Sequence, residues 1–119
     1  MTDVKRSVRV AERVREEIAS ALEREIDDPR LRRVVVTRVE VTDDLQHARV
    51  LVRLTHDDGP EARSNVLRGF RSAGAILRRR IGANLDLRRT PELRFFIDEG
   101  QDAQARIEEL LAEIERERG

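Results

Sequence analysis

The sequence predicts one α+β domain whose elements follow the order helix, strand, strand, interrupted helix, strand, helix. Two long segments, residues 8–26 and 61–83, carry apolar residues at helical spacing, and three short segments alternate apolar and polar residues or are rich in β-branched residues. A chain of 119 residues, 39% of them hydrophobic, is sufficient for one modest core. Residues 1–119 are therefore expected to form a single domain, with only the ends, about 1–6 and 116–119, frayed.

The first helix is predicted over residues 8–26. Its apolar residues recur every three or four positions with Glu and Arg between them, as in a helix that packs on one side. They are Ala11, Val14, Ile18, Leu22 and Ile26. Asp28 precedes Pro29, and a residue before proline is disfavoured in helical dihedrals. The sequence EIDDPRL therefore predicts the end of the helix and a turn.

Two strands are predicted over residues 34–41 and 47–54. The run VVVTRVEV is β-branched almost throughout, and alternate residues of HARVLVRL, from Ala48 to Leu54, share one face. The short polar segment TDDLQ between the strands predicts an antiparallel hairpin. A loop then leads to Pro60, which suits the first turn of the next helix.

The helix predicted over residues 61–83 has two distinct faces. Its apolar face is formed by Val66, Phe70, Ala73, Leu77 and Ile81. Its opposite face is cationic, with small residues between the arginines, and comprises Ser64, Arg68, Arg71, Ala75, Arg78, Arg79 and Gly82. Ser72, Ala73 and Gly74 lie together near the middle, where they make a weak spot in the helix.

A third strand is predicted in LRFFID, residues 93–98, and a final acidic helix follows it. The strand can place Leu93, Phe95 and Ile97 on one face. The apolar residues of the final helix are Ile107, Leu110, Leu111 and Ile114. This helix could fold back over the basic stripe, pair with another copy or cover the sheet. Its apolar stripe is too short for a coiled coil, so packing within a monomer is favoured.

Composition excludes several kinds of site. The chain has no cysteine, so disulfides and thiolate metal sites are excluded, and only His47 and His56 remain as imidazole ligands. Neither histidine has a neighbouring Ser or Cys with an orienting acid, which favours surface histidines over catalysis. The charged N-terminus has no apolar stretch of signal-peptide or membrane-spanning length, which predicts a soluble cytoplasmic protein.

Three acidic pairs fall in predicted turns. They are Asp27-Asp28, Asp43-Asp44 and Asp57-Asp58. Paired carboxylates could serve acid/base chemistry or bind a divalent cation, but Asp is also a preferred cap and turn residue. No EF-hand loop, phosphate-cradling glycine loop or zincin helix accompanies them. A structural role is therefore favoured for each pair, and no metal or cofactor is expected.

The strongest functional signal is the distribution of charge. The formal net charge is zero, from 24 basic and 24 acidic residues, yet residues 63–94 contain nine arginines against two acidic residues. The planar guanidinium suits phosphate oxygens, although a solvated helix face in a chain that is 40% charged is the plain alternative. At least two of Phe70, Phe95 and Phe96 are expected in the core, so base stacking on the sheet in the manner of an RRM is not expected. Contact mainly through phosphates is favoured.

Three segments at these separations resemble ribosome-binding factor A, a family of bacterial ribosome-assembly proteins. They are EIDDPRL after the first helix, VEVTDDLQHARV across the hairpin and RRTPELRFFIDE into the last strand. The resemblance covers about residues 9–111 and implies a KH-like fold of type II topology, with helices on one face of a three-stranded mixed sheet. It also implies a monomer that binds the immature small (30S) ribosomal subunit and assists late maturation of 16S rRNA, with importance for growth in the cold and without enzymatic activity.

The resemblance further implies where RNA binds. KH domains clamp the nucleic-acid backbone with a GXXG loop between two helices, whereas this family has an interhelical kink there, usually Ala, any residue, Gly. The matching triplet is Ser72-Ala73-Gly74, and a serine that bonds back to a carbonyl one turn earlier should preserve a kink. The RNA-facing residues implied by the family are Arg78, Arg79, Arg80, Arg88 and Arg89. Helix geometry adds Arg68 and Arg71.

Two other classes of function remain open. A general KH-type binder of single-stranded RNA would bind short oligonucleotides as well as it binds subunits. A protein-interaction module would bind a protein partner with little salt dependence and would tolerate loss of the arginines. An enzyme is the least favoured class, because no local catalytic signature is present.

Overall fold

The computed structural model describes residues 5–56, 59–100, 111–112 and 114–117. The elements follow the predicted order and are α1 (Arg6–Arg24), the 3-10 turn η1 (Pro29–Leu31), β1 (Val34–Val41), β2 (His47–Leu54), α2 (Pro60–Asn84) and β3 (Glu92–Ile97). Residues 111–112 and 114–117 are also helical. Within the described part of the chain, no helix is long and apolar enough to cross a membrane.

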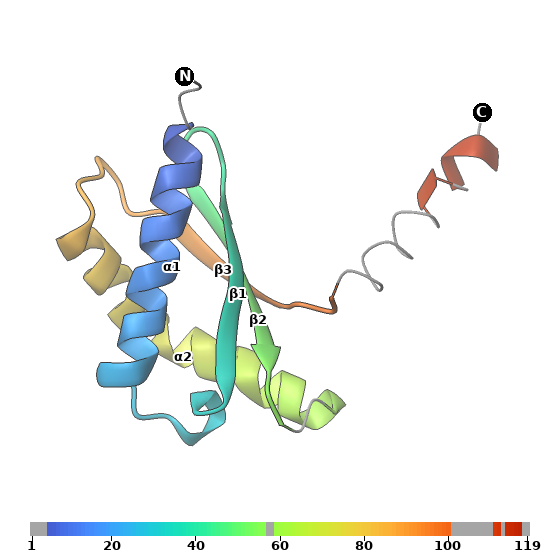
Figure 1. Ribbon diagram of the computed structural model, residues 1–119, viewed down its shortest axis with the longest axis horizontal. Coiled ribbons are helices and arrows are strands. Elements are labelled where there is room, and N and C mark those ends of the chain that lie inside the picture. The colour runs from blue at the N-terminus through green and yellow to red at the C-terminus, as the bar shows by residue number, and fades with distance from the viewer. Residues whose placement is uncertain (1–4, 57–58, 101–110, 113, 118–119) are drawn as a thin grey trace.

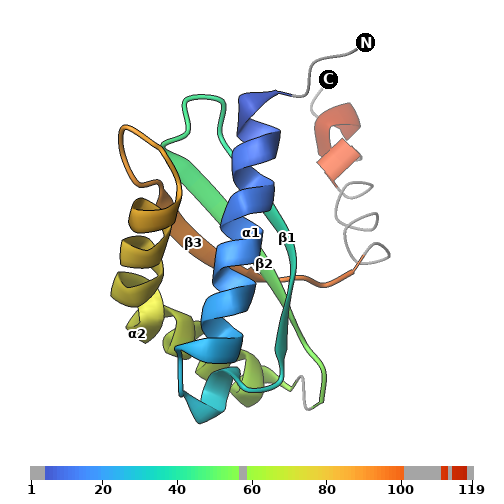
Figure 2. The same cartoon turned by 60° about the vertical axis from the view of Figure 1, so that its left-hand side comes forward.

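The three strands form one mixed sheet in the order β1-β2-β3. β1 and β2 are antiparallel, with Val34 opposite Leu54, and β2 and β3 are parallel, with Ala48 opposite Leu93. Parallel neighbours need a long crossover, and α2 provides it. Both α1 and α2 pack against the same face of the sheet (Figure 1 and Figure 2). The predicted α+β architecture, with helices on one face of a three-stranded mixed sheet, is confirmed.

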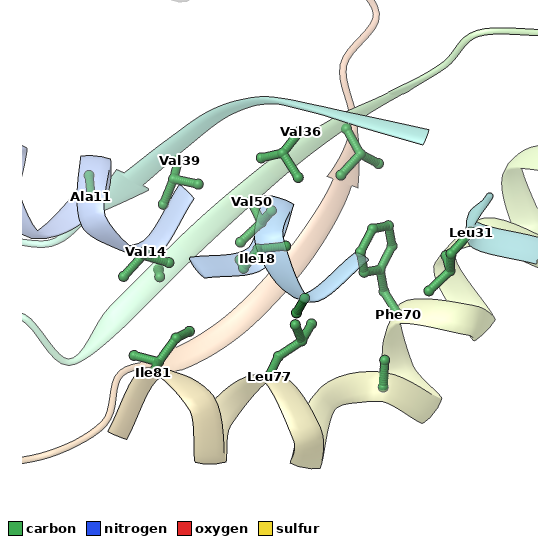
Figure 3. Close-up of a cluster of buried hydrophobic side chains, with 14 of the residues drawn as sticks. Ala11, Val14, Ile18, Leu31, Val36, Val39, Val50, Phe70, Leu77 and Ile81 are labelled. Carbon is green, nitrogen blue, oxygen red and sulfur yellow. The ribbon is translucent and has the colours of Figure 1, made fainter. Parts of the chain in front are cut away.

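The core lies between the sheet and the two helices (Figure 3). Val50 and Val52 of β2 and Phe70 and Leu77 of α2 are all fully buried in one hydrophobic cluster. The Phe70 ring stacks on the Phe95 ring of β3, with 4.5 Å between centroids and 12° between planes. All five residues of the predicted apolar face of α2 are buried, so that prediction is confirmed.

The first helix and its turn form as predicted, but two residues earlier. α1 runs from Arg6 to Arg24. After its end, the Ile26 amide donates a hydrogen bond to the Ala21 carbonyl at 2.8 Å. Asp28 has extended dihedrals, φ −121° and ψ 117°, and its carboxylate accepts a hydrogen bond from the Arg30 amide at 2.9 Å. The end of the helix before proline is therefore confirmed.

The hairpin between β1 and β2 shows the structural role of an acidic pair. The Asp44 carboxylate accepts hydrogen bonds from the Thr42 hydroxyl at 2.6 Å and from the Gln46 amide at 3.0 Å. These bonds hold a turn in which Leu45 takes a left-handed conformation, φ 62°. The structural interpretation is thus confirmed for the first two acidic pairs, while Asp57-Asp58 lies outside the described residues.

The predicted C-terminal helix is described only in part. Leu111 and Ile114 are 56% and 40% exposed, so these two members of the predicted apolar stripe are not packed in a core as favoured from the sequence. The other two members, Ile107 and Leu110, lie outside the described residues.

Candidate nucleic-acid interface

The interface is built on α2, which is continuous yet bent. The sequence predicts an interrupted helix, whereas hydrogen bonding is helical throughout Pro60–Asn84. The ribbon nevertheless changes direction in its yellow middle part, in both views (Figure 1 and Figure 2). In the described part of the chain the Ser72 hydroxyl makes no hydrogen bond, so the predicted bond from serine to a carbonyl one turn earlier is wrong. A bend at Ser72-Ala73-Gly74 stays a prediction.

The two halves of α2 pack against different partners. In the first half, Gly69 lies against η1, so closely that a Cβ placed on it would be 2.9 Å from the Leu31 Cδ2 atom. In the second half, Arg80 and Asn84 hydrogen-bond to Glu17 of α1. These contacts, one on each side of the middle of the helix, hold the two halves in their separate directions.

An open groove of about 440 Å³ runs between α2 and β3. Its lining is apolar at the base and basic at the rim, and consists of Leu67, Phe70, Arg71, Gly74, Arg78, Leu93, Arg94, Phe95 and Phe96. A Cβ placed on Gly74 would meet no atom within 4 Å, so the glycine leaves this wall of the groove open. A chain with negative phosphates can lie here with its backbone against the arginines.

The strand that borders the groove is the edge of the sheet. The Glu92 amide bonds to the Gln46 carbonyl at 2.8 Å, and the Asp98 amide bonds to the Val52 carbonyl at 2.7 Å. Because alternate residues of a parallel strand bond to the same neighbour, the amides and carbonyls of Leu93 and Phe95 face away from β2. An edge strand with unpaired backbone groups is a hydrogen-bonding template for another chain or for base edges.

Six of the seven predicted arginines are exposed and make no ion pair within the described residues, and three of these six lie on α2 and also make no side-chain hydrogen bond there. They are Arg71, Arg78 and Arg79. Arg71 and Arg78 line the groove, where they meet Arg94 of β3, whose only ion pair in the described part is a 3.4 Å contact with Glu92. Arg68 is also exposed, but its guanidinium donates to the Asn65 side chain one turn earlier.

Arg88 and Arg89 lie at a second place. They line an open hollow of about 760 Å³ together with Arg6, Asp44 and Asp86. Two carboxylates in this hollow offset part of its positive charge, whereas none of the described residues that line the groove between α2 and β3 is acidic. The predicted site residues therefore divide between two surfaces.

Arg80 has a different position from its two neighbours in sequence. Its guanidinium donates to Glu17 at 2.9 Å, to Glu25 at 3.0 Å and to the Ser20 hydroxyl at 2.7 Å, all on or next to α1. The carboxylates of Glu25 and Glu17 raise the pKa of Arg80. Arg80 therefore points to α1 and binds two carboxylates, unlike Arg78 and Arg79, and RNA contact by Arg80 stays a prediction.

The sequence-based site omitted two residues of the groove. Arg94 and Phe96 alternate with the buried side of β3, and Phe96 is 40% exposed, with the Arg49 guanidinium 5.3 Å from its ring centre. The alternation in LRFFID could have identified both, since it places them on the face opposite Leu93 and Phe95.

The histidines and carboxylates form no further site in the described residues. His47 Nδ1 is 3.6 Å from Glu92, and His56 Nδ1 is 3.1 Å from the Thr55 carbonyl, both on the surface. No group of three or more His, Asp or Glu side chains in this part of the chain is arranged to hold a metal ion.

The fold and the groove define a KH-like domain of the type II order with a basic edge beside its last strand. The family model of ribosome-binding factor A matches residues 6–111. Ribosome-binding factor A of Sorangium cellulosum is 53% identical over 114 residues, which cover 93% of this chain and 90% of that protein. The chain therefore belongs to the ribosome-binding factor A family.

Solved structures of the family show the same fold. The crystal structure of ribosome-binding factor A from Thermus thermophilus matches with a TM-score of 0.67 at 21% identity, and the match covers 76% of this chain and 93% of that one. A model of the Thermus thermophilus protein fitted into a cryo-electron microscopy map of a 30S–RbfA complex matches with a TM-score of 0.54 at 23% identity, over 76% of this chain and 89% of that one.

Proposed function

We propose that this protein binds the immature small (30S) ribosomal subunit through RNA phosphates at the groove between α2 and β3, and thereby assists late maturation of 16S rRNA. Membership of the ribosome-binding factor A family supports binding to the ribosome. The 30S complex named for the Thermus thermophilus relative supports the small subunit as the target. The protein acts as a monomer in the cytoplasm, and its importance is greatest for growth in the cold.

The mechanism is selective binding without chemistry. A bound protein shifts an equilibrium between two RNA arrangements only by its difference in affinity for them. The groove between α2 and β3 provides such a difference in affinity, because it accepts a phosphate backbone of one curvature better than a backbone of another. The protein then dissociates once maturation has removed the arrangement that it prefers.

The observation that carries this proposal is the pair of unpaired arginines in the groove. Arg71 and Arg78 have no ion pair in the described residues, so their donors are available to phosphate oxygens without the loss of an internal contact. Arg79 lies beside them on the exposed face and extends the same positive surface.

The test reverses the charge of the two groove arginines. We expect the affinity of the variant Arg71→Glu/Arg78→Glu for purified small subunits to fall by at least roughly tenfold. The plot of log affinity against log salt should become less steep by about two, one for each phosphate contact that is lost. Binding is measured by co-sedimentation over a range of salt concentrations. The variant Arg9→Glu/Arg33→Glu makes the same change in net charge on exposed arginines away from the groove, and it should keep the slope of the wild type. Equal binding by the two variants would refute the site.

A general single-stranded RNA binder is the second candidate, favoured by the backbone groups of Leu93 and Phe95 that face away from β2 beside the groove. Such a protein reads bases that are splayed from a single strand. Competition between small subunits and short oligonucleotides separates the two functions. Oligonucleotides that displace the protein at concentrations comparable to those of subunits would favour the general binder.

A further inference from the structure

Glu17 is the most connected acidic residue at the contact between α1 and α2. One of its carboxylate oxygens, Oε2, accepts hydrogen bonds from Arg80 Nε and from Asn84 Nδ2, both at 2.9 Å. Its side chain is only 17% exposed, and that of Arg80 is 23% exposed. A half-buried ion pair of this kind has a more defined geometry than a pair on the open surface.

The contact between α1 and α2 continues from Arg80 to the C-terminal end of α2. Arg13 of α1 donates to the carbonyl of Asn84, the last residue of α2, at 3.2 Å. Arg80 and Asn84 lie four residues apart, on one face of the helix. With Ser20, which bonds to Arg80, three side chains of α1 therefore restrict the position and rotation of the last turn of α2.

The rotation of α2 decides where its arginines point. Successive residues of a helix are about 100° apart around the axis, so Arg78 lies about 200° from Arg80. When Arg80 is held against α1, Arg78 is therefore directed almost away from α1. This is the side on which Arg78 lines the groove with Arg71 and Arg94.

We propose that Glu17 is a positioning residue of the RNA-binding surface, which holds the second half of α2 through Arg80 and Asn84 so that Arg78 faces the groove. The inference rests on the proposed function, because it concerns the same surface. In this proposal Arg80, which was predicted to bind RNA, instead holds α2 in place through its ion pair with Glu17.

The inference opposes what charge alone predicts. Removal of the Glu17 carboxylate raises the net charge of the protein by one, and a more positive protein should bind RNA more tightly. A positioning role predicts weaker binding instead, because the arginine that meets the phosphates is no longer held in place. The sign of the change in affinity therefore separates the two explanations.

The experiment compares Glu17→Ala, Glu17→Gln and the matched control Glu16→Ala. Glu16 is exposed and makes no hydrogen bond in the described residues, and its replacement changes the net charge by the same amount. We expect Glu17→Ala to weaken binding to small subunits roughly two- to thirtyfold, with an unchanged salt slope because no phosphate contact is removed. Glu17→Gln keeps an acceptor oxygen and should fall between Glu17→Ala and the wild type, although both variants have the same charge. Glu16→Ala should bind at least as tightly as the wild type.

Unfolding in urea, followed by circular dichroism, is measured for each variant so that binding is compared among folded proteins. If Glu17→Ala does not fold, the comparison of Glu17→Gln with Glu16→Gln replaces it, with the same expected sign. Binding by the Glu17 variants that equals or exceeds that of the Glu16 variants would overturn the positioning role. Insensitivity to Arg71→Glu/Arg78→Glu would instead overturn the proposed function, so the two failures are distinguishable.

Discussion

The two glycines in the interior of α2 should respond in opposite ways to the same substitution. Alanine in place of glycine in a helix interior stabilises a protein by about 1 kcal/mol when the new methyl group has space. Gly74 has that space, since a Cβ there would meet no atom within 4 Å, and its φ is not positive. At Gly69 the methyl group would lie 2.9 Å and 3.1 Å from two atoms of Leu31, which is only 4% exposed.

Overpacking of this kind costs about 1–3 kcal/mol. The helix-propensity gain is common to both substitutions and cancels in their difference. We therefore expect Gly74→Ala to be more stable than Gly69→Ala by about 1–3 kcal/mol, with Gly74→Ala above the wild type and Gly69→Ala at or below it.

The assay is equilibrium unfolding in urea, followed by far-ultraviolet circular dichroism because the chain has no Trp or Tyr. Unchanged slopes of free energy against urea would show that only stability has changed. A Gly69→Ala variant as stable as Gly74→Ala would refute the close packing of α2 on η1.

Two further predictions concern the sheet and the core. The Thr37 hydroxyl, the Gly100 amide and nearby arginines lower the pKa of Asp98. The ionised carboxylate therefore stabilises the fold above its unfolded pKa, and this stabilisation is lost as the pH falls through the lowered pKa. Thr37→Val should reduce the free energy of unfolding, measured in urea, by more at neutral pH than at about pH 2. Phe70→Ala should cost about 3–5 kcal/mol by the same assay, because the ring is fully buried and stacks on Phe95, and a loss below about 1 kcal/mol would contradict the observed core.

The fold could be predicted because its signals are local. The spacing that places Phe70 and Leu77 on one side of α2 and the alternation that places Val50 and Val52 on one side of β2 both follow from the geometry of a single element. The ends of elements were harder to predict, as the two-residue shift of α1 shows, because a helix can begin before its first apolar residue when small side chains such as Ser7 are buried as well.

The bend of α2 illustrates a different limit. The sequence indicated a weak spot at Ser72-Ala73-Gly74, and the expected cause was a hydrogen bond from the serine hydroxyl. The structure instead shows external contacts on each half, Gly69 on Leu31 and Arg80 on Glu17. Such contacts join residues far apart in the chain, so no local pattern contains them.

Arg80 shows most clearly why the site was less predictable than the fold. Three successive arginines look equivalent in sequence, yet a helix directs them about 100° apart, and only a knowledge of what lies on each side tells them apart. The partners of Arg80, Glu17 and Glu25, are 63 and 55 residues earlier in the chain. Net charge alone predicts that these two carboxylates weaken RNA binding, because they neutralise a basic residue. The geometry gives the opposite result: the arginine that they bind anchors the helix, and the arginines that remain unpaired are thereby directed to the groove.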